Sequence, residues 1–364
     1  MNHPDKRTHD NEDSGQPDQV LVLGATGGIG GEVARQLAQA GWKVVAMART
    51  LPQRDADADS SDGHDRNGAI TWLRGDAMCA ADVLDAARGC AVIVHAVNPP
   101  GYRNWAGQVL PMLDNTIAAA EVHGALVVLP GTVYNYGPDA FPLADEEAPQ
   151  HPATRKGKLR EQMEARLEAY GRRGGRALIV RAGDFFGPGA GNTWFAQGLL
   201  KPGRAPTAIA NPGSAGVGHQ WAYLPDVAAT MVALIARRAA LPAFARFHMT
   251  GHWDQDGTAM AGAIARVAAR HGIAARIKAF PWWMVVLAAP FHETMREMLE
   301  MRYLWRQPLQ LDNARLAAEL GAEPHTPLEQ AVERTLVGLG CLPGVGRSDR
   351  GLTSSRTATS ADRA

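Results

Sequence analysis

The sequence predicts an α/β fold in which a doubly wound parallel sheet is followed by a smaller C-terminal lobe. Between Gln19 and about Pro188, short runs of aliphatic and β-branched residues alternate with stretches whose apolar residues keep helical spacing. Strands that are separated by helices pair in parallel, and such a sheet is buried on both faces. Beyond Pro188 this alternation gives way to Gly- and Pro-rich segments, which indicates a second lobe that is partly interleaved with the sheet.

Six strands and six helices are predicted in chain order. The strands are expected at residues 19–25, 43–48, 69–75, 91–97, 125–132 and 176–183. The helices are expected at residues 30–41, 82–89, 105–124, 158–175, 226–238 and 259–272. The Asp- and Ser-rich stretch at 50–68 is too polar to pack and is predicted as a loop. The division expected from these patterns is a sheet domain at 19–188 and a lobe at 189–342.

Composition and charge exclude several classes of function. The 37 Lys and Arg residues balance 37 Asp and Glu residues, so no overall basic field points to a nucleic-acid or membrane partner. Cys79, Cys90 and Cys341 show no C-x-x-C spacing, which fits a reduced compartment without disulfides or zinc. His248 and His252 are four residues apart, but in a Gly-containing stretch that is ill-suited to a zinc helix, so no metal site is predicted.

The two ends of the chain and one apolar segment indicate where in the cell the protein is located. Residues 1–18 and 343–364 are polar and are predicted to be disordered, and the first of these is no secretory signal. The window Phe280–Phe291 is about half as long as a membrane-spanning helix requires. It is predicted to be a buried segment of the second lobe, or alternatively part of the lining of a substrate pocket. A cytoplasmic location is therefore expected.

A glycine-rich turn joins the first strand to the first helix. Gly24, Gly27 and Gly30 stand at intervals of three in "LVLGATGGIGG". A pyrophosphate must approach the backbone closely there, and the positive end of the following helix favours its charge. The sequence therefore predicts a dinucleotide-binding turn rather than an ordinary tight turn. Its expected contact residues are Gly24, Thr26, Gly27, Gly28, Ile29 and Gly30.

The end of the second strand bears on which dinucleotide is bound. An acidic residue there would bind the ribose 2′-hydroxyl of NAD, but "VVAMART" offers Arg49 instead. A guanidinium suits a 2′-phosphate, so NADP is favoured, with NAD remaining possible. The alternative interpretation of Arg49 is a solvated loop arginine.

The order of motifs resembles the extended short-chain dehydrogenase/reductases, also described as the NAD-dependent epimerase/dehydratase family. The similarity extends from about Val20 to Leu336 and rests on "GATGGIG", "GDAM", "VIVHAV", "PGTVYNYG", "RAGDFFGP" and "WAYLPDVA". It implies a nicotinamide-dinucleotide Rossmann domain with a C-terminal substrate lobe. It also implies that Asp76 lies near the adenine and that His95, Ala96 and Val97 run along the cofactor.

The resemblance also implies an altered catalytic set. Thr132 occupies the position of the family's catalytic serine, and Lys158 matches the lysine that lowers the tyrosine pKa and holds the nicotinamide ribose. Alternatively, Lys158 is a solvated lysine at the start of the helix and Lys156 takes the ribose role. The tyrosine itself is replaced by Thr154, whose hydroxyl pKa is too high for that proton transfer. Three interpretations remain: Tyr134 carries the proton, a water or the substrate carries it, or the protein binds the dinucleotide without turnover. The alternative interpretation of Tyr134 is a packing aromatic, which the sequence favours.

The resemblance bears on the substrate as well. Nucleotide-sugar members of the family carry an asparagine where this chain has Asp184, and an arginine where it has His219. Both differences argue against a nucleotide sugar. Asn192 and Trp221 belong to segments rich in aromatic residues, which suits an uncharged or weakly polar carbonyl compound.

Two functions are consistent with this pattern. The first is an NADP-preferring oxidoreductase that transfers hydride on a small carbonyl or hydroxyl substrate. The second is a non-catalytic NADP-binding redox sensor or regulator. A homodimer through the helices after the fourth and fifth strands is what the resemblance implies.

Overall fold

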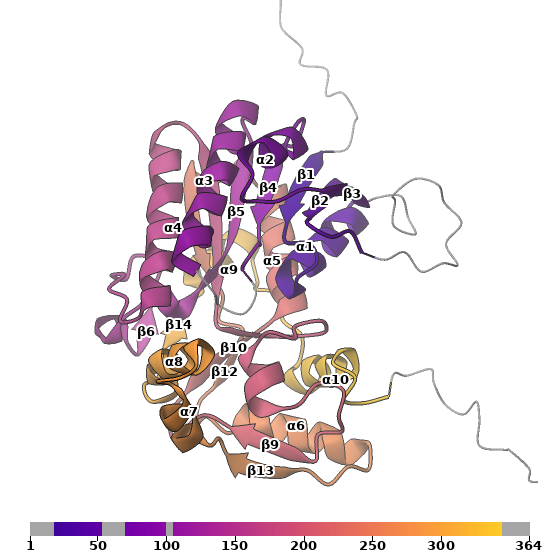
Figure 1. The fold of residues 1–364 in the computed structure, drawn as a ribbon, viewed down its shortest axis with the longest axis vertical. Coiled ribbons are helices and arrows are strands. Elements are labelled where there is room, and N and C mark those ends of the chain that lie inside the picture. Colours follow the sequence, from indigo (N-terminus) through magenta and orange to yellow (C-terminus); the bar gives the residue numbers. More distant parts are fainter. Residues whose placement is uncertain (1–17, 53–69, 100–104, 344–364) are drawn as a thin grey trace, which may run out of the picture.

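The structure, a computed structural model, describes residues 18–52, 70–99 and 105–343. Its main feature is a seven-stranded parallel sheet with the strand order β11-β7-β5-β4-β1-β2-β3 (Figure 1). The strands are β1 (Gln19–Leu23), β2 (Lys43–Ala48), β3 (Ile70–Arg74), β4 (Val92–His95), β5 (Leu126–Thr132), β7 (Arg176–Ala182) and β11 (Phe244–His248). The chain order reverses between β1 and β4, the place where doubly wound sheets bind ligands. The predicted fold class is confirmed.

Several predictions fall on residues outside this description. Of the two ends predicted to be disordered, only Asp18 and Pro343 belong to the described residues. The predicted polar loop at 50–68 is described only as far as Pro52.

Helices cover both faces of the large sheet. One face carries α1 (Gly28–Gln39) and α5 (Leu224–Ala236), and the other carries α2 (Ala80–Ala86), α3 (Trp105–His123) and α4 (Arg155–Arg172). Successive side chains of β1 enter the two cores in turn, with Val20 and Val22 on one side and Leu21 and Leu23 on the other. This double burial explains why the strands are continuous apolar runs in the sequence.

Part of the C-terminal half returns to the large sheet. Helix α5, which was predicted, packs beside α1, and β11 pairs in parallel with β7 as the edge strand. The strand β11 was not predicted, because Arg246 interrupts its short apolar run "FARFH".

The remaining strands form small sheets, and the remaining helices lie beside them, except α9, which packs against β11 of the large sheet (Figure 1). The strands are β8 (Asp184–Phe186), β10 (His219–Tyr223) and β12 (His252–Asp254) in one sheet, β9 (Ala208–Asn211) and β13 (Arg276–Ala279) in a second, and β6 (Leu143–Ala144) and β14 (Gln310–Leu311) in a third. The helices are α6 (Ala259–Arg270), α7 (Trp282–Ala288), α8 (Glu293–Glu300), α9 (Ala314–Leu320) and α10 (Leu328–Gly338). No helix in the described part of the chain is both long and apolar enough to cross a membrane.

The apolar window Phe280–Phe291 corrects a prediction, because most of its large side chains are exposed rather than buried. Trp283, Leu287 and Phe291 are 67%, 66% and 86% exposed, whereas Val285 and Ala289 are buried. The helix α7 has only seven residues and packs against α8 through one face. Residues at 283 and 287, four apart, share a face that points away from the protein.

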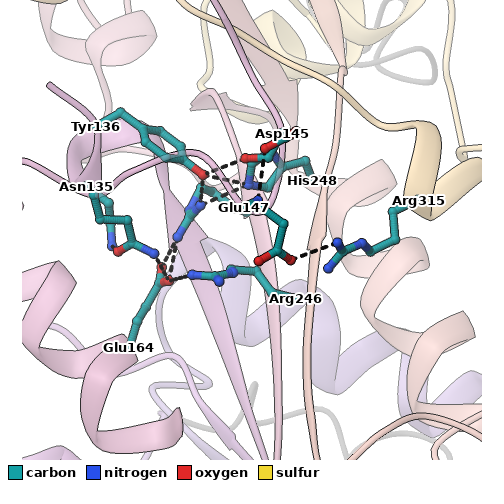
Figure 2. A network of polar contacts seen from close by, with 10 residues as sticks. Asn135, Tyr136, Asp145, Glu147, Glu164, Arg246, His248 and Arg315 are labelled. Carbon is teal, nitrogen blue, oxygen red and sulfur yellow. Dashed lines mark hydrogen bonds and ion pairs between the residues drawn. The ribbon is translucent and has the colours of Figure 1, made fainter. Parts of the chain in front are cut away.

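A network of buried polar side chains joins the carboxyl ends of β7 and β11 to α4 (Figure 2). The Arg181 side chain is fully buried, and its Nη2 lies 2.5 Å from Oε2 of Glu164, which is 4% exposed. Arg246 Nη1 lies 3.3 Å from the same carboxylate oxygen. One carboxylate on α4 thus pairs with arginines from two neighbouring strands.

His248 belongs to the same network as a neutral ring. Its Nδ1 lies 3.2 Å from the carbonyl oxygen of Ala144 and therefore donates, which leaves Nε2 to accept from Arg181 Nη1 at 2.8 Å. Burial, and then the positive charge of Arg181, lower the pKa of His248 to about 2. The hydroxyl of Tyr136 lies 2.9 Å from the same Nε2, so the segment after β5 is tied to β11.

We expect Glu164→Ala to lower the free energy of unfolding by about 3–5 kcal/mol, because it leaves the Arg181 guanidinium buried without its carboxylate. Urea denaturation measures this loss. Glu168→Ala is the matched control, since Glu168 pairs with Arg172 on the exposed side of the same helix and should cost less than about 0.5 kcal/mol. Equal losses for the two variants would contradict a structural role of the buried pair.

Candidate functional site

The turn between β1 and α1 requires glycine because backbone segments approach one another closely. Gly24 has φ of +89°, and a Cβ there would lie 2.6 Å from the carbonyl oxygen of Ala96. A Cβ at Gly30 would lie 2.3 Å from the oxygen of Gly24. Thr26 and Gly27 are exposed, and no side chain of the described residues caps α1. The first N–H groups of α1 are therefore free to bind an anionic group.

The end of β4, beside this turn, carries a buried histidine with one unsatisfied nitrogen. His95 Nδ1 lies 2.8 Å from Oγ1 of Thr116, whose hydroxyl donates to the carbonyl oxygen of Met112 at 3.0 Å. Nδ1 therefore carries the proton, and Nε2 has no hydrogen-bond partner among the described residues. Burial, and then the charge of Arg160, lower the pKa of His95 to about 3, so the ring is neutral.

The other residues predicted to contact a cofactor lie at the same edge of the sheet. Arg49 is exposed directly after β2, and Ala96 and Val97 are partly exposed directly after β4. Asp76, after β3, accepts the N–H of Met78 at 3.0 Å and so shapes the turn before α2. The glycine turn, the uncapped helix and the unsatisfied His95 nitrogen together fit a dinucleotide.

A pocket of about 170 Å³ lies beside this edge. Its lining includes four of the predicted catalytic and substrate-binding residues, namely Thr132, Tyr134, Asp184 and Asn192. Aromatic and thioether side chains supply much of the rest, among them Trp105, Phe185, Trp194, Met298 and Met301. The pocket therefore joins polar groups from the strand ends to an apolar wall that α8 and the segment after it help to build.

Tyr134, Asp184 and His219 form a hydrogen-bonded chain that leads from the pocket into the second lobe. The hydroxyl of Tyr134 donates to Asp184 Oδ1 at 3.0 Å, and His219 Nε2 lies 2.9 Å from Asp184 Oδ2. His219 Nδ1 lies 3.3 Å from the carbonyl oxygen of Leu304. A carboxylate oxygen and a carbonyl oxygen are both acceptors, so each ring nitrogen of His219 faces an acceptor.

The position of His219 is further held by stacking. Its ring lies parallel to the indole of Trp305, at 3.7 Å between centroids and 8° between planes. Asp184 and His219 are each only 6% exposed. In the sequence, His219 stands out only because it occupies the place of a family arginine. Its contact with Asp184 could not be predicted, because the two residues stand 35 positions apart.

The start of α4 differs from the sequence-based prediction. The helix begins at Arg155 rather than at Lys158, and Thr154 is its N-cap residue, whose hydroxyl oxygen accepts the N–H of Gly157 at 3.0 Å. Thr154 is therefore engaged in starting the helix. Lys158 is exposed and does not line the pocket, because the helix turns it toward solvent.

Lys156 and Arg160 line the pocket instead. They are four residues apart on the inner face of α4 and are 7% and 9% exposed. Lys156 Nζ lies 3.5 Å from Oε2 of Glu297 on α8, and burial lowers the Lys156 pKa while Glu297 opposes that shift. Arg160 Nη2 donates to Asn98 Oδ1 at 3.4 Å. Lys156, Arg160 and Glu164 follow one another in the sequence at intervals of four. This spacing already indicates that the three side chains lie on one face of the helix.

The remaining two predicted substrate contacts differ in their placement. Asn192 lines the pocket, and its Oδ1 accepts a hydrogen bond from Gln197 Nε2 at 3.1 Å. Trp221 does not line it: this side chain is 2% exposed and packs with Phe186 and Phe195 in the core of the second lobe. The Trp221 side chain points inward from β10, which buries its indole. Asp184, which pairs with Trp221 on the neighbouring strand β8, lines the pocket.

Several solved structures have a fold similar to that of this chain. UDP-glucuronic acid 4-epimerase from Bacillus cereus, in complex with UDP-glucuronic acid and NAD, has a TM-score of 0.66 and 14% identity over 88% of this chain and 98% of that chain. MoeE5, in complex with UDP-glucose and NAD, has a TM-score of 0.65 and 16% identity over 88% and 98%. WbmH from Bordetella bronchiseptica, in complex with NAD+, has a TM-score of 0.64 and 16% identity over 89% and 98%. At such identities the likeness supports the fold alone.

The sequence itself carries the family assignment. No curated protein matches this chain. Residues 20–248 match the model of the NAD dependent epimerase/dehydratase family. That match runs from β1 and its glycine turn to β11, so it includes every strand of the large sheet. The chain therefore belongs to the NAD-dependent epimerase/dehydratase family.

Proposed function

We propose that this chain is an NADP-preferring oxidoreductase that transfers hydride to or from a small carbonyl or hydroxyl compound. The observation that carries the proposal is the pocket in which Thr132, Tyr134 and Asp184 meet at the edge of the sheet that bears the glycine turn. Membership of a family of NAD-dependent enzymes supports it. When bound, the nicotinamide supplies or accepts the hydride.

The cofactor would be held by the edge formed by β1 to β4. The turn from Gly24 to Gly30 and the first N–H groups of α1 would bind the pyrophosphate, and Asp76 would lie near the adenine. Ala96 and Val97 would flank the dinucleotide, with His95 Nε2 as a neutral acceptor beneath it. Arg49 would pair with a 2′-phosphate.

The proton would be exchanged at Tyr134 Oη. In the reducing direction this hydroxyl would turn from Asp184 Oδ1 and give its proton to the substrate oxygen, and Tyr134 would then take a proton back from solvent. The carboxylate of Asp184 accepts from Tyr134 at Oδ1 and faces His219 Nε2 at Oδ2, so it would hold the hydroxyl in place without itself passing a proton on. Thr132 would orient the carbonyl by donating a hydrogen bond.

Lys156 and Arg160 would take the part that the family resemblance gave to Lys158. Both lie in the pocket at the helical interval of four, and an ammonium or guanidinium there can donate to ribose hydroxyls or to the substrate oxygen. The carboxylate of Asp184 shares the lining with these two cations, and Lys156 is itself paired with Glu297, so the pocket offers no surplus of positive charge to a diphosphate. A small carbonyl compound seated against Trp105 and Trp194 is therefore the substrate class that the lining suits.

The first test combines binding and turnover. We expect fluorescence titration to give tighter binding of NADPH than of NADH, and NADPH absorbance to fall with at least one member of a panel of aldehydes, ketones and quinones. Arg49→Ser should weaken NADPH binding about tenfold or more and leave NADH unchanged, whereas Lys43→Ser, at the other end of the same strand, should change neither. Tight binding without turnover would favour the redox regulator, and no binding of either dinucleotide would refute both functions.

Tyr134→Phe tests the proton path. It removes the hydroxyl but keeps the ring, so we expect kcat/KM to fall by about 10²–10⁴ while the KM for NADPH stays nearly unchanged. Tyr170→Phe is the control, because that hydroxyl donates to the carbonyl oxygen of Ala125 at 2.9 Å, away from the pocket. Wild-type turnover in Tyr134→Phe would assign the proton transfer to water or to the substrate.

Two lysines on one helix test the assignment within α4. Lys156→Met should lower kcat/KM by about a hundredfold or more, because it removes a donor from the pocket. Lys158→Met should stay within about twofold of wild type, because Lys158 is exposed. The melting temperatures of both variants are measured as well. An unchanged melting temperature of Lys156→Met would show that its loss of activity does not come from a fold weakened by the lost contact with Glu297. A larger loss of activity for Lys158→Met would contradict the orientation of α4.

A further inference from the structure

The second lobe presents a concentrated apolar surface. We call it the α7 patch, and its five side chains, with their exposed fractions, are Trp283 (67%), Met284 (53%), Val286 (45%), Leu287 (66%) and Phe291 (86%). Large apolar side chains scattered singly over a surface need no explanation, whereas a contiguous group marks a binding surface.

The patch stands on a firmly placed helix. Trp282 turns inward, its Nε1 donates to the carbonyl oxygen of Pro212 at 2.9 Å, and its ring lies 5.8 Å from that of Trp194. Val285 and Ala289 are buried beneath the helix. The exposed side chains are therefore held outward by packing on the opposite side of α7.

The segments before α7 and after α8 carry four basic side chains, which we call the basic rim. Arg276 and Lys278 are exposed on β13, which leads into α7, and Arg302 lies 4.9 Å above the ring of Trp282. Arg306 is exposed and close enough to Arg302 to lower the pKa of that guanidinium, after the larger effect of desolvation. Within the described ranges, none of these four side chains is in an ion pair with a carboxylate.

Acidic side chains near the patch are fewer and mostly engaged. Glu297 and Glu300 on α8 pair with Arg155, and Glu297 also pairs with Lys156. Glu293 is the exposed acid between α7 and the rest of α8. In the described segment from β13 to Arg306, basic side chains outside ion pairs therefore outnumber acidic ones, although the chain as a whole is neutral.

We propose that the α7 patch docks this protein onto an anionic lipid bilayer. Aromatic and aliphatic side chains on a short helix suit insertion at the level of the headgroups, and a basic rim suits anionic lipids. A second copy of this chain suits the patch less well, because a two-fold contact would bring the basic rim onto itself. The prediction that the protein has no membrane partner was based on its overall charge. An overall charge of zero does not show whether basic and apolar side chains are concentrated in one part of the surface.

Docking would also place the pocket near the bilayer. The helix α8 follows α7 directly, packs against it and contributes Thr294 and Met298 to the pocket lining. The docking itself requires neither dinucleotide nor turnover, so it can be tested apart from the proposed oxidoreductase activity.

The test is co-sedimentation of the full chain with phosphatidylcholine vesicles, with and without phosphatidylglycerol. We expect binding to the anionic vesicles that weakens with salt. Leu287→Ser and Phe291→Ser should each weaken it by about tenfold. Val122→Ser, which changes an equally exposed side chain on α3, is the matched control and should have no effect.

Charge reversal forms the second arm. Lys278→Glu with Arg306→Glu should weaken binding to anionic vesicles about tenfold, and Lys43→Glu should not. Unchanged melting temperatures would show that the exposed substitutions leave the fold intact. Absence of binding, equal binding to both vesicle types, or wild-type binding by Leu287→Ser would each overturn the proposal. A dimer in size-exclusion chromatography that Leu287→Ser dissociates would assign the patch to a second copy.

Discussion

The buried ion pair between Arg181 and Glu164 determines how α4 is rotated about its axis, and that rotation decides which side chains reach the pocket. Glu164 stands four residues after Arg160 and eight after Lys156, so the three share one face of the helix. A different rotation of α4 would separate Glu164 from Arg181 and leave the guanidinium in the core without its carboxylate. Thr154 supplies the second constraint, because its cap begins the helix at Arg155.

The chemistry of the pocket depends on both halves of the chain. Tyr134 follows β5, and Asp184 stands two residues after the end of β7, so both are placed by the large sheet. His219, by contrast, comes from β10 and is stacked on Trp305. A buried carboxylate that faces a tyrosine on one side and an imidazole on the other is positioned by two partners at once. The second lobe is therefore part of the site, and changes in its packing around Trp305 would reach Asp184.

Most of the fold could be predicted from the sequence, because each strand of a parallel sheet is a short apolar run and the glycine turn marks the first βα junction. The strand β11 was missed because Arg246 stands in its middle, and only the distant Glu164 explains how that charge is accommodated. The exposure of α7 was missed for a different reason. Apolar composition predicts burial, but it does not say whether a neighbouring element covers the helix.

Residues at strand ends were easier to predict than residues on the helix face. The ends of β1, β4 and β5 are fixed by the sheet, so the structure brings Gly24, His95 and Thr132 to one edge, as the motifs predicted. On a helix each residue turns the side chain by about 100°, so a shift of two residues moves it to the opposite side. That shift separates Lys156 from Lys158, and no property of the two lysines themselves distinguishes them.

The late entry of β11 into the large sheet has a consequence for synthesis of the chain. His248 stands 67 residues after Arg181, so β7 is complete on the ribosome well before its outer neighbour has been made. During that interval β7 presents an open edge with unpaired backbone groups, which can pair with other chains. Long-range pairing of this kind also slows folding. A nascent chain of this protein that stalls before β11 would therefore require protection by a chaperone.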